Sequence, residues 1–147
     1  MPNKYEKVDG QVLLVPDAYR DLFVRPIVVA LVTLMPDGQP QATPIWADYD
    51  GTYVRVNSAR GRQKDKNMRV GARVTVLVID PNDTGRWLEV RGRIAEVTEV
   101  GANEHINALN LKYEGHADFF ANKQDRLDKE QRVTYKIEPF RINTNSD

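Results

Sequence analysis

The sequence predicts a mainly β (α+β) fold, in which six mostly antiparallel strands form a closed or nearly closed barrel with two or three small helices at its periphery. Three observations predict it. Apolar, strand-like segments recur along the chain and are separated by short turn signals. Helical patterns are few and short. The 147 residues contain no repeat, linker or low-complexity segment, so we expect one domain spanning residues 1–147 with a core of its own.

The first three strands are predicted within residues 25–58, "RPIVVALVTLMPDGQPQATPIWADYDGTYVRVNS". Pro36-Asp37-Gly38 supplies the first turn and Asp50-Gly51 the second, which is a strong hairpin signal. Tyr49 and Tyr53 flank the second turn, and we interpret both as strand packing residues.

The second half of the barrel is predicted from three further segments. Residues 73–80, "RVTVLVID", are β-branched and apolar on both faces, which is typical of a central strand covered on both sides. A turn at 81–85 leads into a strand over 86–97, and residues 132–140 form the closing strand.

Strand 86–97 has two different faces. Leu88, Val90 and Ile94 form an apolar face that should point into the barrel. The other face mixes an aromatic side chain with opposite charges, at Trp87, Glu89, Arg91 and Arg93. Two interpretations of this face stay open: an exposed barrel wall, or a subunit interface with crossed ion pairs.

Three short helices are expected. Residues 17–23 provide one or two turns, and residues 121–131 are polar and peripheral. Residues 101–115 place Ile106, Leu109 and Tyr113 at helical spacing, and Gly115 is the expected C-cap.

Composition excludes several classes of function. Lys and Arg total 21 and balance 21 Asp and Glu, so the chain lacks the general positive field that drives nucleic-acid binding. There is no cysteine, which excludes disulfides and thiolate sites. The N-terminus lacks the apolar core of a signal peptide, and the longest apolar run, 27–35, is too short to span a bilayer. We therefore expect a cytoplasmic protein without nucleic-acid or membrane partners and without a metal.

A local cluster of cations stands at residues 57–69, "NSARGRQKDKNMR", with one acid, Asp65. If a helix runs from about Gly61 to Val70, Lys64 shares a face with Met68, the main apolar residue, which should point inward. A lysine there must snorkel, pair with a carboxylate or meet an anionic ligand. The segment also enters a helix N-terminus, which suits a phosphate. A solvated surface helix and an anion site both remain open on these residues.

Four motifs, in their order and spacing, resemble one known family: "DGQPQATPIW", "VNSARGRQKDKNM", "VLVIDP" and "LEVRGRIAEVTE". They resemble the pyridoxamine 5′-phosphate oxidase-like split-barrel proteins. Within that family the chain is most similar to the flavin/deazaflavin-dependent oxidoreductases, which use FMN or the deazaflavin coenzyme F420. The similarity covers residues 43–115, the hairpin before them and the closing strand.

The resemblance implies a six-stranded antiparallel split β-barrel of the FMN-binding type. It also implies a homodimer with two cofactors in grooves between the subunits. The site residues it implies are Arg62 and Lys64 for the phosphate, Asn57 and Ser58 as hydrogen-bonding neighbours, Thr43, Pro44, Ile45 and Trp46 along the ring, Arg60 and Lys66 as tail contacts, and Trp87 of the partner as a wall.

Departures from the family pattern narrow the expected activity. Arg62 and Lys64 are separated by Gln63, whereas pyridoxamine-phosphate oxidases carry adjacent Arg-Lys. The chain ends "PFRINTNSD", without the histidine of their substrate motif, so vitamin B6 oxidation is not expected. We prefer F420 as cofactor, with FMN as the alternative.

The expected activity is hydride transfer from the reduced cofactor to a small unsaturated acceptor. No side chain stands out as a catalytic acid or base. The two histidines, His105 and His116, are isolated in sequence from any carboxylate at a diagnostic spacing, and we interpret both as structural or surface residues. A non-catalytic carrier of the same cofactor is the alternative function.

Overall fold

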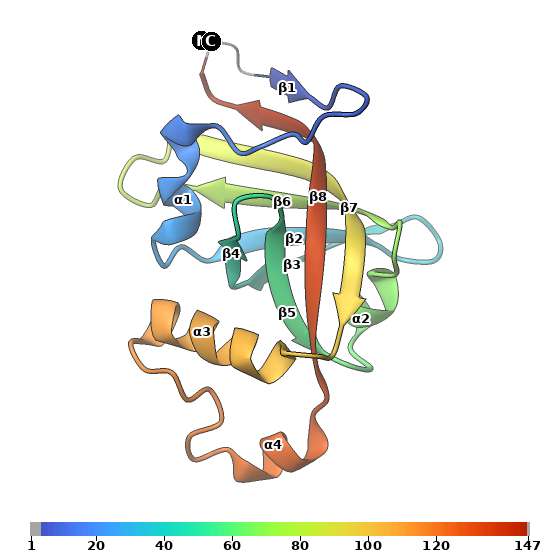
Figure 1. The fold of residues 1–147 in the computed structure, drawn as a ribbon, viewed down its shortest axis with the longest axis vertical. Coiled ribbons are helices and arrows are strands. Elements are labelled where there is room, and N and C mark those ends of the chain that lie inside the picture. The colour runs from blue at the N-terminus through green and yellow to red at the C-terminus, as the bar shows by residue number, and fades with distance from the viewer. Residues whose placement is uncertain (1–3, 147) are drawn as a thin grey trace.

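The computed structural model describes residues 4–146 as a mainly-β, antiparallel, curled split barrel with a few short helices (Figure 1). Its strands are β1 (Lys4–Glu6), β2 (Val29–Leu34), β3 (Pro40–Ile45), β4 (Ala47–Tyr49), β5 (Val54–Ala59), β6 (Arg73–Ile79), β7 (Trp87–Thr98) and β8 (Arg132–Thr144). The split-barrel fold class predicted from the sequence is confirmed.

The sheet order is β3-β2-β6-β7-β8-β5-β4, and β1 pairs with β8. All of these pairs are antiparallel. The two ends of this order, β3 and β4, are parts of one stretch of chain separated only by Trp46. The sheet therefore curls until one bent strand forms both of its ends. Six strands were predicted because β3 and β4 read as one; β1 was not predicted, and β8 runs four residues beyond 140.

The helices are η1 (Asp17–Tyr19), α1 (Asp21–Val24), α2 (Gln63–Asn67), α3 (Ala102–Glu114) and α4 (Gln124–Lys129). Gly115 ends α3 with a φ of 88°, as expected of a left-handed C-cap. In Figure 1, α3 and α4 lie together at one end of the barrel. The helix expected from about Gly61 to Val70 is shorter than predicted, because only five residues, Gln63–Asn67, are helical.

The core fills the barrel interior with the alternate residues of each strand. Leu88, Val90 and Ile94 are buried, as the sequence predicted. The prediction that 73–80 is covered on both faces is wrong for the single chain. Its even-numbered valines are buried, but Leu77 is half-buried and Ile79 is exposed. Antiparallel pairing turns alternate side chains outward, and the outer side of β6 stays open in one chain.

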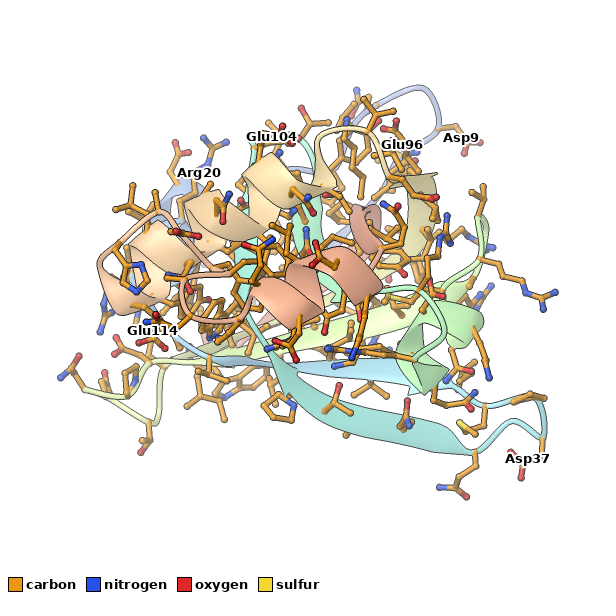
Figure 2. All side chains as sticks on the ribbon, turned by 90° about the horizontal axis from the view of Figure 1, so that it is seen from below. Asp9, Arg20, Asp37, Glu96, Glu104 and Glu114 are labelled. Atoms are coloured by element: carbon orange, nitrogen blue, oxygen red, sulfur yellow. The ribbon has the colours of Figure 1, made fainter. Side chains whose placement is uncertain are left out.

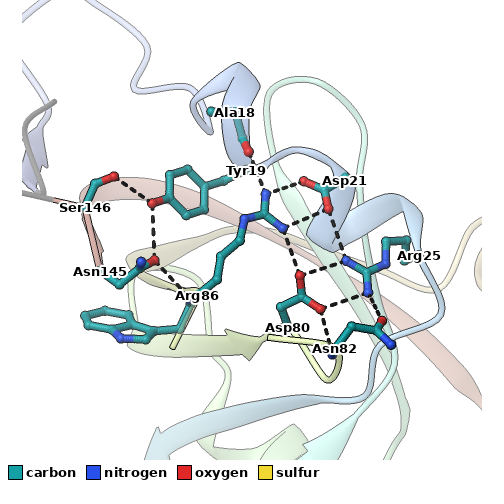
Figure 3. Close-up of polar contacts among 10 residues, drawn as sticks. Ala18, Tyr19, Asp21, Arg25, Asp80, Asn82, Arg86, Asn145 and Ser146 are labelled. Carbon is teal, nitrogen blue, oxygen red and sulfur yellow. Dashed lines mark hydrogen bonds and ion pairs between the residues drawn. The ribbon is translucent and has the colours of Figure 1, made fainter. Parts of the chain in front are cut away.

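An ion-pair cluster fixes α1 to the β6–β7 turn (Figure 3). Arg25 lies 2.9 Å from Asp80, and Arg86 contacts both Asp80 at 3.1 Å and Asp21 at 2.6 Å. The pKa of the Asp80 carboxyl is held well below its usual range, mainly by the hydrogen bond from Arg25 and next by that from the backbone N–H of Asn82. The cluster thus secures the segment that leads into β2.

Within residues 4–146, none of the helices is long and apolar enough to cross a membrane.

Candidate functional site

A groove of about 370 Å³ lies between β3, β5 and α3. Its lining residues fall into an apolar set and a polar, mostly cationic set. They are Val28, Pro44, Ile45, Trp46, Ile106, Leu109 and Phe119, and Asn57, Arg62, Lys64 and Arg132. The groove is thus a mostly apolar slot with positive charge in its polar part.

Trp46, at the break between β3 and β4, is held in place by aromatic neighbours. Its ring stacks on Tyr113 of α3, with centroids 5.0 Å apart and an interplanar angle of 7°. Phe119 meets it edge-on at 6.3 Å. The Tyr113 hydroxyl donates to the Ile27 carbonyl at 2.6 Å and accepts from the Ala47 N–H at 3.2 Å. The apolar wall is therefore fixed to the backbone just after the break, at Ala47, and to the segment that leads into β2, at Ile27.

Lys112 also holds the chain in place next to the break at Trp46. Its amine donates to the carbonyl of Ala47 at 2.6 Å and to that of Phe23. Burial lowers the pKa of Lys112 to about 8, although Asp48 opposes this. Residues of α3 thus fasten the bent strand that carries the groove.

The residues expected along the ring lie together on β3 and the break that follows it. Pro44, Ile45 and Trp46 line the groove, and the Thr43 hydroxyl accepts from the Lys64 amine at 3.5 Å. Because β3 is an end strand of the sheet, backbone groups on its outer side are not paired within the sheet. A polar ring could find donors and acceptors there.

Lys64 is the distinctive cation of the groove. It is half-buried, and burial first, then Arg62 and Arg132, lowers the pKa of its amine. Within the described chain, no carboxylate forms an ion pair with it. Met68 beside it is buried, as its predicted inward face requires. The cost of partly burying this charged amine is therefore not offset by a carboxylate of the described chain.

Arg132 is a groove residue that sequence reasoning missed. It is 3% exposed, and it donates to the side-chain oxygen of Asn57 at 2.9 Å and to Glu130 at 3.0 Å. Its guanidinium lies 5.1 Å from the centre of the Phe119 ring. The sequence did contain a signal for it. Arg132 is the first residue of the apolar strand "RVTYKI", and a charged side chain at the start of a buried strand needs a partner.

Besides Thr43, which contacts Lys64, four expected site residues lie outside the groove lining of this chain. Ser58 is fully buried on β5, and its hydroxyl has no hydrogen-bond partner in the described structure. Arg60 pairs with Asp65 at 3.3 Å and approaches Glu99. Lys66 is exposed. Trp87 lines a separate groove with residues of β7 and β8.

Besides its ion pair with Arg60, Asp65 fixes the conformation of the cation segment. Its carboxylate accepts from the Gly61 N–H at 2.9 Å and from the Tyr135 hydroxyl. The Arg62 N–H donates to the Ala59 carbonyl at 3.4 Å. The backbone N–H groups of the two residues before this very short helix are therefore already bonded, and it is the cationic side chains that favour binding of an anion.

His105 is not isolated in the fold. It is buried, and its ring nitrogens lie 3.1 Å from Asp48 and 2.9 Å from Thr134. Asp48 comes from β4, so the contact was invisible in sequence. This network joins α3 to the sheet, in agreement with a structural role; His116 is exposed. Among residues 4–146, no group of three acidic or histidine side chains could hold a metal ion.

Comparisons with known proteins place this geometry in a family. The pyridoxamine 5′-phosphate oxidase family model matches residues 15–146. The structure of an F420 reductase is 31% identical, covers 88% of this chain and 98% of its own, and superimposes with a TM-score of 0.74. No curated protein matches the sequence.

Two further structures share the fold. A conserved hypothetical protein of Mycobacterium tuberculosis is 21% identical, with coverage of 94% and 88% and a TM-score of 0.71. A putative pyridoxamine 5′-phosphate oxidase of Listeria innocua is 21% identical, with coverage of 88% and 98% and a TM-score of 0.65. Since the family model spans nearly the whole described chain, the protein belongs to the pyridoxamine 5′-phosphate oxidase family.

Proposed function

We propose that this chain is an oxidoreductase that binds coenzyme F420 in the groove beside β3. The observation that carries the proposal is Lys64, a half-buried cation with no ion-pair partner in the described chain, beside an apolar slot. An anionic group on a largely apolar ligand would complement both features.

The residues of the groove fit such a cofactor. Lys64, Arg62 and Arg132 would hold a phosphate, and each charge-assisted hydrogen bond is worth about 1.5–3 kcal/mol. The backbone of β3 and the fixed Trp46 would orient a planar ring. Ile106, Leu109 and Phe119 form an apolar side of the slot that would shield the bound ring from water. When bound, F420 supplies hydride transfer to a small unsaturated acceptor, and the protein supplies position and charge.

Two observations favour F420 over FMN. The F420 reductase is the 31% identical structure, and Arg62 and Lys64 are spaced by one residue instead of adjacent. FMN remains the alternative cofactor, since the family pattern accommodates both. The proposal also includes a homodimer, in which Trp87, which lines a separate groove of its own chain, would form a wall of the cofactor groove of the second copy.

Titration of the apo-protein with F420 and FMN, followed by ring fluorescence, tests the proposal. We expect saturable binding of F420; tight FMN binding with none for F420 would overturn the assignment. The loaded protein is then mixed with quinones, enones and tetrapyrroles. Acceptor-dependent oxidation of the reduced cofactor identifies an enzyme, whereas binding without turnover identifies a carrier.

A further inference from the structure

Glu130, between α4 and β8, is surrounded by three arginines. Its carboxylate lies 2.9 Å from Arg126, 3.0 Å from Arg132 and 3.3 Å from Arg62. Burial works to raise the pKa of the Glu130 carboxyl, but hydrogen bonds from Arg126 and Arg132 outweigh it and keep that pKa below its usual value. Glu130 is therefore an anion at every pH near neutrality.

Two of these arginines, Arg62 and Arg132, also line the groove. Part of the positive charge available to a ligand is thus already balanced from within the chain, and Lys64 is the groove cation without such a partner. A ligand phosphate that reaches Arg62 and Arg132 must share them with a fixed negative charge. Each further charge on that phosphate adds repulsion from Glu130.

Phosphate groups differ in this respect. A terminal monoester, as in FMN, has a second pKa of about 6 and carries close to two charges at neutral pH. A diester, as in F420, carries one. We propose that Glu130 is a specificity-determining residue, whose carboxylate makes the groove favour singly charged phosphodiesters over doubly charged phosphomonoesters. This inference rests on the proposed cofactor groove.

The neighbours of Glu130 make the substitution Glu130→Gln informative. Arg132 is held from its other side by Asn57, so it stays in the groove when the carboxylate is replaced. The glutamine oxygen can still accept from Arg126. The change therefore removes one charge and keeps the shape of the site.

The experiment measures binding of FMN and F420 to the wild type and to Glu130→Gln. Phenyl phosphate and methyl phenyl phosphate serve as ring-free monoester and diester probes, followed by ³¹P NMR. We expect Glu130→Gln to strengthen monoester binding about tenfold relative to diester binding, equivalent to about 1.4 kcal/mol. Glu104→Gln is the control, since Glu104 is exposed on α3 (Figure 2).

A pH series separates charge selection from a purely structural role. The charged groups around Glu130 are Arg62, Arg126 and Arg132, with Lys64 lining the same groove and Lys123 beside Phe119. The arginines keep their charge throughout. As pH falls from 7.5 to 5.5, the monoester gains a proton, so the advantage of Glu130→Gln for monoesters should shrink toward that for diesters.

An unchanged monoester-to-diester ratio, or an advantage that does not vary with pH, overturns the inference. If the small probes follow the expected pattern while neither FMN nor F420 binds, the charge selection stands and the proposed cofactor assignment fails.

Discussion

At the scale of single residues, the charged side chains of segment 57–69 have different roles, although the sequence shows them only as one run of charges. Asp65 holds Gly61 and Tyr135, and Arg60 contacts Asp65. These contacts shape the segment so that Arg62 and Lys64 reach the groove. Lys66, two positions on, is exposed and serves as a matched comparison.

Replacing Lys64 by alanine should weaken cofactor binding by about 1–3 kcal/mol, the scale of one lost charged hydrogen bond. Lys66→Ala should cost less, because that side chain does not line the groove. Fluorescence titration of both variants measures the difference. Equal and negligible effects of the two substitutions would support the alternative interpretation, in which the segment is a solvated surface helix.

The lowered pKa of Lys112 predicts that the free energy of unfolding increases at alkaline pH. Its pKa falls from an ordinary 10.5 to about 8 in the fold, so the unfolded chain binds more protons between these values. Below pH 8 the buried amine is charged and its full destabilising effect is present. The free energy of unfolding should therefore rise as pH increases from about 8 to 10.5.

Relative to Lys112→Met, the wild type should gain about 1–3 kcal/mol in the free energy of unfolding from pH 7.5 to pH 10.5, allowing for partial solvent exposure. Urea unfolding of both proteins at the two pH values measures this gain. Parallel pH dependence of the two proteins would show that the amine is not penalised by burial.

At the scale of elements, the pairing of β7 with β8 depends on one glycine. The register shifts between Arg91 and Gly92, where a bulge lets the two long strands bend around the barrel. A Cβ at Gly92 would stand 2.6 Å from a methyl carbon of Ile137 and 2.7 Å from the Glu138 carbonyl oxygen. Only glycine permits this close approach.

Gly92→Ala should therefore destabilise the protein by about 1–3 kcal/mol through overpacking against backbone. Gly85→Ala is the control, since its nearest neighbour, an Asp83 oxygen, lies at an ordinary 3.6 Å. Thermal unfolding of the two variants gives the comparison. Similar melting temperatures would mean that the strands can separate there at little cost.

At the scale of the whole molecule, the outer faces of β2, β3 and β6 form a continuous, largely apolar surface. The cross-strand pairs Ala30–Leu77, Val32–Ala42 and Leu34–Pro40 belong to it. Leu34 and Ile79 are 47% and 44% exposed. Apolar surface of this kind marks association sites, and we propose it as the homodimer interface.

Ile79→Glu should shift the protein from dimer to monomer at micromolar concentration, because it introduces a charge into that surface. Val100→Glu is the control, since Val100 is 87% exposed beside α3. Sedimentation velocity distinguishes the two states. A wild type that is monomeric throughout would remove the proposed role of Trp87 as a wall from the partner.

The sequence by itself determined the fold class, the bounds of β6 and β7 to within one residue, and the inward face of β7. Alternation and turn chemistry are local, so they can be read along the chain. It also singled out Lys64 through its spacing from buried Met68.

Only the tertiary structure decided which charges meet. Arg132 and Glu130 join Arg62 from a segment about 70 residues away, and Asp48 reaches His105 across 57 residues. The break at Trp46 likewise depends on Lys112 and Tyr113 of α3, which bind the backbone of Ala47 directly after it. These contacts arise from curling one sheet until its ends meet, and no local pattern in the sequence tells which distant residues that closure brings together.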